Sequence, residues 1–199
     1  MAVHTRSTQL VLALLCLLSR SVFADTFLIL DQSGKPIKGA VIELTAVEGS
    51  SPAADKKQTA VMDQVNKRFE PELLVIKVND DVNFPNSDNI RHHVYSFSPA
   101  KPFELKLYSG QPKAPLSFEK SGIVVLGCNI HDSMVGYIYV SETEHYLVTD
   151  ENGEASVDPN IVYQGVRVWH PHQSGGHMSV KRIDRDSLKP SGEGNQVLS

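Results

Sequence analysis

Cys128, His131 and Met134 follow one another at three-residue intervals on one short stretch of the chain. A thiolate, a thioether and two imidazoles are the ligands of a type 1 (blue) copper site. The upstream pair His92 and His93 offers the second imidazole, and the spacing alone leaves open which of the two it is. These residues therefore predict a site for one type 1 copper ion.

Two apolar runs flank the ligand stretch, at residues 122–126 (GIVVL) and 136–140 (GYIYV). Short β-branched or aromatic runs bounded by glycine are typical of buried strands. The ligands would then lie on a tight turn that the protein core holds from both sides. Such rigidity suits an electron carrier, because the metal must keep nearly the same geometry as Cu(I) and as Cu(II).

Other interpretations of the same residues explain less. An ordinary buried cysteine would need neither His131 nor Met134 at this spacing. A copper-delivery protein would use similar ligands, but enclosure by four ligands favours electron transfer over delivery. A cysteine–histidine hydrolase would use Cys128 as nucleophile, yet a base three residues away on a tight loop points poorly at the thiol. No oxyanion-hole motif is evident either, so we predict that the protein is not an enzyme.

The stretch over residues 58–141 resembles the cupredoxins. The resemblance is carried by residues 84–88 (FPNSD), 92–98 (HHVYSFS) and 125–134 (VLGCNIHDSM). The short spacing of the ligand loop is similar to that of amicyanin. Within the cupredoxins, the stretch is similar to a plastocyanin-like group of small exported proteins often labelled methylamine utilisation proteins.

The resemblance implies that His92 binds copper together with Cys128, His131 and Met134. In the family the first histidine ligand is commonly followed by Asn-Val, and here His93 stands in the place of the asparagine. That asparagine joins the two ligand loops by hydrogen bonds. Its replacement by His93 therefore affects the hydrogen bonds around the copper ligands and not the ligands themselves. The resemblance also implies a Greek-key β-sandwich and a carrier of single electrons. Its redox partner would be a c-type cytochrome or a quinoprotein dehydrogenase, in methylamine oxidation.

Residues 1–24 have the pattern of a secretory signal peptide, with a short apolar core and small residues before the expected cleavage site. Cleavage would remove Cys16, and the single remaining thiol cannot form an internal disulfide. It would also remove Arg6 and Arg20 and no acidic residue, which changes the formal net charge from −4 to −6. We therefore expect a monomer in the periplasm, without a transmembrane segment once the leader is removed. Its acidic surface disfavours nucleic acids and permits docking to a basic partner.

The segments that flank the cupredoxin-like stretch predict further β-structure. Residues 26–30 and 40–45 are typical of strands, residues 146–157 predict a hairpin with an Asn-Gly turn, and residues 165–170 predict a last strand. These segments resemble the two halves of a small β-sandwich similar to the carboxypeptidase regulatory module. We therefore predict an all-β protein, a Greek-key cupredoxin sandwich with an additional small β-sandwich module built from the flanking segments.

The predicted division of the chain has five parts, with an exposed linker over residues 49–54. The parts are the signal peptide (1–24), the first half of the small module (25–48), the cupredoxin domain (58–141), the second half of the module (142–180) and a disordered polar tail (181–199).

His170, His172 and His177 lie together near the end of the predicted module. A histidine-rich, glycine-containing segment can bind divalent ions weakly at neutral pH. A second metal site at these residues therefore stays open from the sequence, although surface histidines without a ligand are more common.

Overall fold

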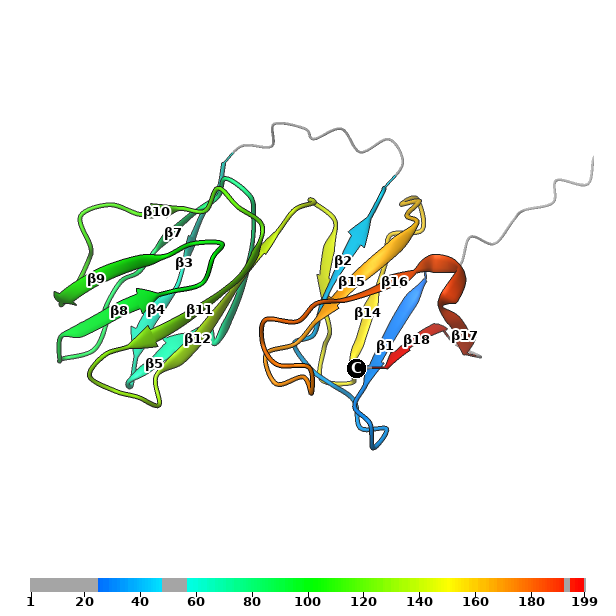
Figure 1. Cartoon of the computed structure of the whole chain (residues 1–199), viewed down its shortest axis with the longest axis horizontal. Helices are drawn as coiled ribbons and strands as arrows, with labels where there is room; N and C mark the ends of the chain where they lie inside the picture. The colour runs from blue at the N-terminus through cyan, green and yellow to red at the C-terminus, as the bar shows by residue number, and fades with distance from the viewer. Residues whose placement is uncertain (1–24, 48–56, 192–193, 199) are drawn as a thin grey trace, which may run out of the picture.

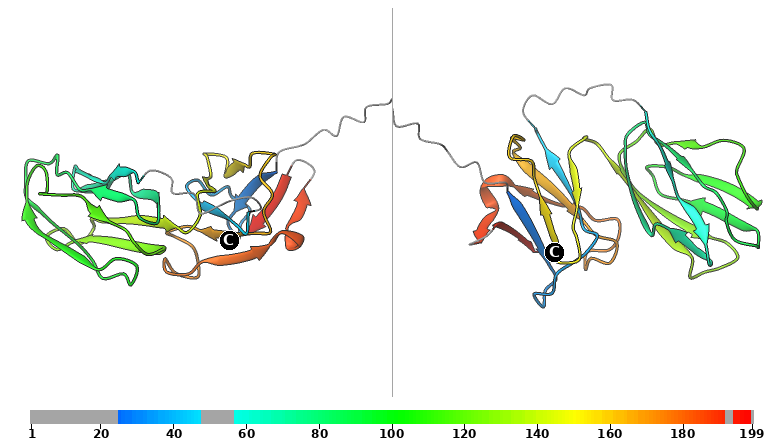
Figure 2. Two further views of the ribbon diagram at one scale, coloured as in Figure 1. Left: turned by 90° about the horizontal axis from the view of Figure 1, so that it is seen from above. Right: turned by 180° about the vertical axis from the view of Figure 1, so that it is seen from behind.

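The structure, a computed structural model, describes residues 25–47, 57–191 and 194–198. Its regular secondary structure is almost entirely β-strand, and the strands form two β-sandwich units side by side (Figure 1). Figure 2 shows the same side-by-side arrangement from above and from behind. The predicted signal peptide and the predicted linker over residues 49–54 lie outside the described residues. Within the described part of the chain, no helix has the length and apolar character needed to cross a membrane.

The central unit has a five-stranded sheet in the order β6-β12-β11-β8-β9. Opposite it lie a three-stranded sheet, β10-β7-β3, and the hairpin β4-β5. The bounds are β3 Thr59–Val61, β4 Asp63–Val65, β5 Arg68–Glu70, β6 Leu73–Lys77, β7 Asp81–Asn83, β8 His92–Ser96, β9 Phe103–Tyr108, β10 Leu116–Ser117, β11 Gly122–Cys128 and β12 Val135–Ser141.

Alternation along the strands builds the core between these layers. On β8, His92, Val94 and Ser96 are buried while His93 and Tyr95 are only half-buried, as the period of two requires. Apolar side chains of both layers meet in one cluster, which also contains Cys128 and Met134. Two of the three predicted metal ligands at the β11–β12 turn are therefore part of the hydrophobic core.

The second unit combines both ends of the described chain. Its two four-stranded sheets have the orders β14-β1-β18-β17 and β13-β2-β15-β16. The bounds are β1 Thr26–Leu30, β2 Val41–Thr45, β13 Tyr146–Val148, β14 Glu154–Ser156, β15 Gly165–Trp169, β16 Lys181–Asp184, the 3₁₀ turn η1 Arg185–Ser187, β17 Lys189–Ser191 and β18 Gly194–Leu198. This confirms an additional β-sandwich built from the flanking segments. We call it the flanking module.

The two units bury a shared apolar layer. Tyr137 and Tyr139 on the outer face of β12 pack against Trp169 of β15, with ring centroids 5.8 and 5.7 Å from the indole. Val41 of β2 and Ile123 of β11 belong to the same buried cluster. Because β12 is covered on both faces, all of its residues after Val135 are buried.

A buried carboxylate closes this interface. Glu43 of β2 is 1% exposed and accepts hydrogen bonds from the hydroxyls of Tyr139 (2.8 Å) and Ser141 (3.0 Å). It also accepts from the backbone amides of Glu142 (2.7 Å) and Thr143 (3.1 Å). One side chain of the flanking module thus satisfies four donors at the end of β12. Burial and the charge of Glu43 raise the pKa of Tyr139, so this hydroxyl remains a donor at neutral pH.

The predicted hairpin over residues 146–157 is wrong. The turn is present, but β13 pairs with β2 and β14 pairs with β1, in different sheets. Thr149 accounts for the divergence, because its hydroxyl donates to the carbonyl of Ile37 (2.6 Å) and accepts from the amide of Ala40 (2.9 Å). These bonds hold the chain at the start of β2 just before it turns toward the other sheet.

Two further predictions need correction. The predicted disordered tail is wrong for the described residues after Lys181, because β16 pairs with β15 and β18 pairs with β1 in parallel. The sequence over residues 69–78 also predicts one long strand with Pro71 near its start. The structure has two strands there, β5 and β6, since Pro71 interrupts the run and lacks the amide that a ladder needs. The two halves lie in opposite layers of the central sandwich.

Candidate metal centre

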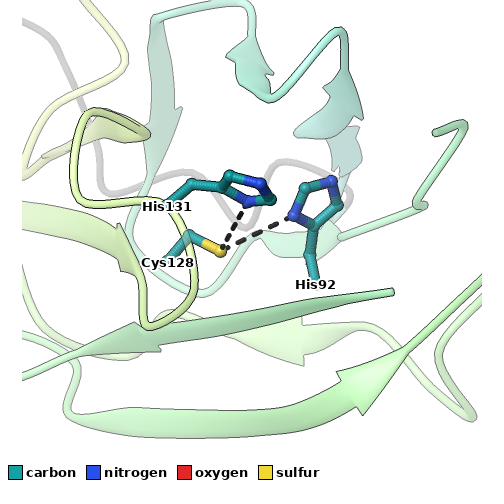
Figure 3. Close-up of side chains that lie close together, drawn as sticks. All are labelled: His92, Cys128 and His131. Carbon is teal, nitrogen blue, oxygen red and sulfur yellow. Dashed lines mark hydrogen bonds between the residues drawn. The ribbon is translucent and has the colours of Figure 1, made fainter. Parts of the chain in front are cut away.

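Three side chains converge at one end of the central sandwich. The Nδ1 atoms of His92 and His131 lie 3.6 and 4.0 Å from the Cys128 sulfur, and Figure 3 shows both rings turned toward it. His92 is 0% exposed and Cys128 is 3% exposed, while His131 is half-buried. The cluster is thus closed on the core side, and its His131 side lies nearest to solvent.

Strand pairing brings these residues together from positions far apart in sequence. β8 and β11 are antiparallel neighbours, with Cys128 opposite Val94. His92 therefore lies on the same buried face of β8, two residues before Val94. The turn after β11 is tightened by hydrogen bonds from the amide of His131 to the carbonyl of Cys128 (3.4 Å) and from the amide of Met134 to the carbonyl of His131 (2.9 Å).

The donor set and its spacing fit one metal ion. Metal bonds of about 2.0 Å to imidazole and 2.3 Å to thiolate, as zinc makes, place nitrogen and sulfur about 3.5–3.8 Å apart in tetrahedral or trigonal geometry. The observed 3.6 and 4.0 Å lie close to that range. Two imidazoles with one thiolate are the in-plane ligands of a type 1 copper site, so His92, Cys128 and His131 can hold one copper ion.

Met134, the fourth predicted ligand, is 1% exposed and belongs to the same core cluster as Cys128. It follows His131 by three residues, and its backbone amide donates a hydrogen bond to the carbonyl of His131. In type 1 sites the axial thioether contact is long and weak. Copper ligation by Met134 therefore stays a prediction.

His93, the alternative to His92, lies on the other face of β8 and is half-buried. Its Nε2 is 2.9 Å from a carboxylate oxygen of Glu104 on β9, and the angles of this contact are not those of a hydrogen bond. The loops are tied nonetheless, because the amide of Asn129 donates to the carbonyl of His93 (3.2 Å). The backbone thus links the loop of the first ligand to the turn that carries Cys128 and His131.

Asp88 is a site residue that the sequence analysis missed. Its Oδ2 lies 2.8 Å from Nε2 of His92, and its carboxylate also accepts from the amides of Asn66 (2.6 Å) and Lys67 (2.9 Å) in the β4–β5 turn. Burial raises the pKa of Asp88, but the hydrogen bonds from Lys67, His92 and Asn66 outweigh it and hold the pKa below its usual value. The available signal was an aspartate four residues before the ligand histidine.

Asn86 holds the loop that carries Asp88 and was also missed. It is 4% exposed, and its side-chain amide donates to the carbonyls of Ile90 (2.9 Å) and Tyr108 (2.8 Å). Its side-chain oxygen accepts from the amide of Asp88 (3.1 Å). Asn86 therefore fixes the backbone path between β7 and the first ligand.

His170, His172 and His177 do not form a comparable site. In residues 25–47, 57–191 and 194–198, only His92, Cys128 and His131 form a group of three or more His, Cys, Asp or Glu ligand atoms within 4.8 Å of one another. His172 lies 3.5 Å from a carboxylate oxygen of Glu72. Burial, followed by the charge of His172, lowers the pKa of His170. These histidines lie at the border of the two units, where His172 and His177 flank the ring of Tyr137.

Comparisons with known proteins return copper proteins among the solved structures. No protein-family model and no curated protein matches the chain. A purple cupredoxin from Nitrosopumilus maritimus is 22% identical, with a TM-score of 0.36, over 43% of this chain and 100% of that chain. An oxidised amicyanin variant is 22% identical, with a TM-score of 0.38, over 50% of this chain and 91% of that chain.

A copper-containing nitrite reductase from Thermus scotoductus SA-01 is 27% identical, with a TM-score of 0.40, over 43% of this chain. The chain spans only 23% of the length of that enzyme. Since every one of these TM-scores is below 0.5, we base the functional proposal on the geometry of the site. The central unit itself is a two-layer β-sandwich with a histidine–cysteine–histidine cluster at one end.

Proposed function

We propose that the protein is a type 1 copper protein that carries single electrons between redox partners. The observation that carries the proposal is the cluster of buried His92 and Cys128 with half-buried His131, whose ligand atoms already lie within 4.8 Å of one another. Copper bound there supplies a reversible one-electron change between Cu(II) and Cu(I). The chain supplies the ligands and the exclusion of water on the core side.

The rigidity of the cluster supports a carrier over a delivery protein. His92 comes from β8 and Cys128 from β11, and these strands are hydrogen-bonded to each other in the core. Ligands fixed in this way change position little when the charge of the metal changes. A delivery protein must release its metal, and the complete burial of His92 opposes release on this side.

The deciding experiment is an absorption spectrum of the copper-loaded protein. We expect an intense visible band from the thiolate–copper(II) bond, which disappears on reduction and returns on oxidation. Cys128→Ser should abolish the band, because a hydroxyl does not replace the thiolate. Copper binding without this band and without reversible reduction would favour the delivery function, and a protein that binds no copper would contradict both.

The resemblance described for the sequence extends the proposal to cellular context. A leader over residues 1–24 would export the chain to the periplasm, where a c-type cytochrome or a quinoprotein dehydrogenase would exchange electrons with it. Methylamine oxidation is the pathway that the resemblance suggests. Mass spectrometry of exported protein should show a chain that starts at Asp25, and retention of Cys16 would contradict the cleavage.

Electrons would leave through His131, because it is the half-buried ligand on the exposed turn. The sequence predicts a small apolar collar of Met134, Val135, Pro99 and Ala100 around this exit. The structure buries Met134, but it leaves Val135 40% and Ile130 46% exposed. A small apolar surface of this kind docks a partner weakly, as a shuttle requires.

Val135→Lys should slow electron transfer to a small c-type cytochrome by about tenfold without changing the copper spectrum. A buried charge at a docking face costs desolvation on each encounter, and ~1.4 kcal/mol corresponds to a factor of ten. The matched control is Val148→Lys on β13 of the flanking module, where valine is 44% exposed. If stopped-flow measurements give equal electron-transfer rates for the two variants, electrons do not leave the protein at the surface around His131.

A further inference from the structure

We propose that Asp88 is a positioning residue that fixes His92 for metal binding and lowers the reduction potential of the site. The inference rests on the proposed copper site and deepens it. Asp88 lies outside the ligand set, yet it is the partner of the more deeply buried histidine. Its effect would reach the metal through the imidazole ring.

The first step is the protonation of the His92 ring. Its Nε2 lies 2.8 Å from the Asp88 carboxylate, and an ionised carboxylate only accepts hydrogen bonds. Nε2 therefore carries a proton in this contact, and Nδ1 is the nitrogen left to bind a metal. Nδ1 faces the Cys128 sulfur at 3.6 Å, so the hydrogen bond at Nε2 orients the ring for metal binding through Nδ1.

The second step is the support of the carboxylate itself. The amides of Asn66 and Lys67 hold it at 2.6 and 2.9 Å. Both residues have positive φ values, 53° and 58°, as a two-residue turn of the primed type requires between β4 and β5. Asn86 accepts from the Asp88 amide at 3.1 Å. The His92 ring is therefore held through β8, through its own loop and through a turn of the opposite layer.

The third step is the electrostatic consequence. His92 is 0% exposed and the Asp88 side chain is 12% exposed, so solvent screens their interaction only weakly. A negative charge behind an imidazole ligand raises its basicity and stabilises the more positive metal ion. Asp88 should therefore favour Cu(II) over Cu(I). Removal of its charge should raise the Cu(II)/Cu(I) reduction potential, so that an external reductant transfers one electron to the site more readily.

The test compares Asp88→Asn with Asp132→Asn, a loss of the same charge at an exposed residue next to His131. For Asp88→Asn we expect a shift of about tenfold in the Cu(II)/Cu(I) equilibrium toward Cu(I), which is ~59 mV for one electron. We also expect a zinc affinity about tenfold weaker in the same variant, as for other outer partners of metal ligands. Asp132→Asn should change both quantities by less than about twofold, since a solvated charge is screened. Equal shifts in the two variants would overturn the role of Asp88.

A measurement on the unaltered metal-free protein keeps the inference testable if Asp88→Asn does not fold. Nitrogen NMR of the labelled His92 ring should show a proton on Nε2. A ring whose proton is on Nδ1 alone would overturn the inference. Failure of the proposed function is distinguishable, because it would appear as a missing type 1 band in the unaltered protein, whereas the ring tautomer and the zinc affinity report on Asp88 alone.

Discussion

His92→Ala is expected to abolish the type 1 absorption band. The substitution removes one of two imidazoles from a cluster whose ligand atoms lie within 4.8 Å, and no other histidine of the cluster can take its place. Copper affinity should fall by more than the roughly 10–100-fold that is typical when only an outer partner of a ligand is removed. Titration with copper, followed by absorption and by electron paramagnetic resonance, measures both effects.

His93→Ala is the matched control, because it removes the neighbouring imidazole from the other face of β8. This variant should keep the band and shift it only slightly, since the link between the loops at His93 runs through its carbonyl. Thermal unfolding of both metal-free variants separates loss of the site from loss of the fold. If His93→Ala is colourless and His92→Ala keeps its colour, His93 is the ligand, and the face of β8 that points to the core is the opposite one.

Glu43→Ala should lower the free energy of unfolding by about 3–5 kcal/mol, the range for removal of one partner from a buried charged network. The substitution would leave the hydroxyl of Tyr139 and the backbone amide of Glu142 without the acceptor they have in this interface. Arg167 of β15, 3.4 Å from the same carboxylate, would also lose a partner. Denaturant unfolding of the metal-free protein measures the change.

Two variants sharpen this test. Glu43→Gln keeps the shape and one acceptor oxygen, so we expect a smaller loss of about 1–3 kcal/mol. Glu142→Gln removes the other, largely exposed carboxylate beside Arg167 and should cost less than about 1 kcal/mol, as exposed ion pairs do. A Glu43→Ala protein as stable as Glu142→Gln would show that the two units hold together without this carboxylate.

The ligand turn could be predicted from the sequence because its information is local. Cys128, His131 and Met134 are close in sequence, and the apolar runs on both sides indicate strands without reference to distant residues. The choice of His92 over His93 needed the resemblance, since either residue can face the core until the register of β8 is known. Strand pairing then determines the face, because Val94 lies opposite Cys128.

The support of the site could not be predicted in the same way. Asp88 meets amides of a turn more than twenty residues earlier in the chain, and an aspartate in a polar loop is usually solvated. The prediction of a hairpin over residues 146–157 is wrong for a related reason. Its Asn-Gly signal describes the turn correctly, but Thr149 binds backbone groups more than a hundred residues away. The polarity of the residues after Lys181 indicates disorder, but edge strands such as β16 tolerate polar side chains as well.

The pairing of β2 with β13 has a consequence for how this chain can be taken apart. Tyr146 lies opposite Glu43, and the amide of Leu44 donates to the carbonyl of His145 (2.8 Å). The points where the chain departs for the central sandwich and returns from it are thus neighbours across one ladder. A short turn could therefore join them, which would remove the whole central sandwich from the chain. The remaining module would expose Trp169 to water, and this newly bared face would need polar replacements to stay monomeric.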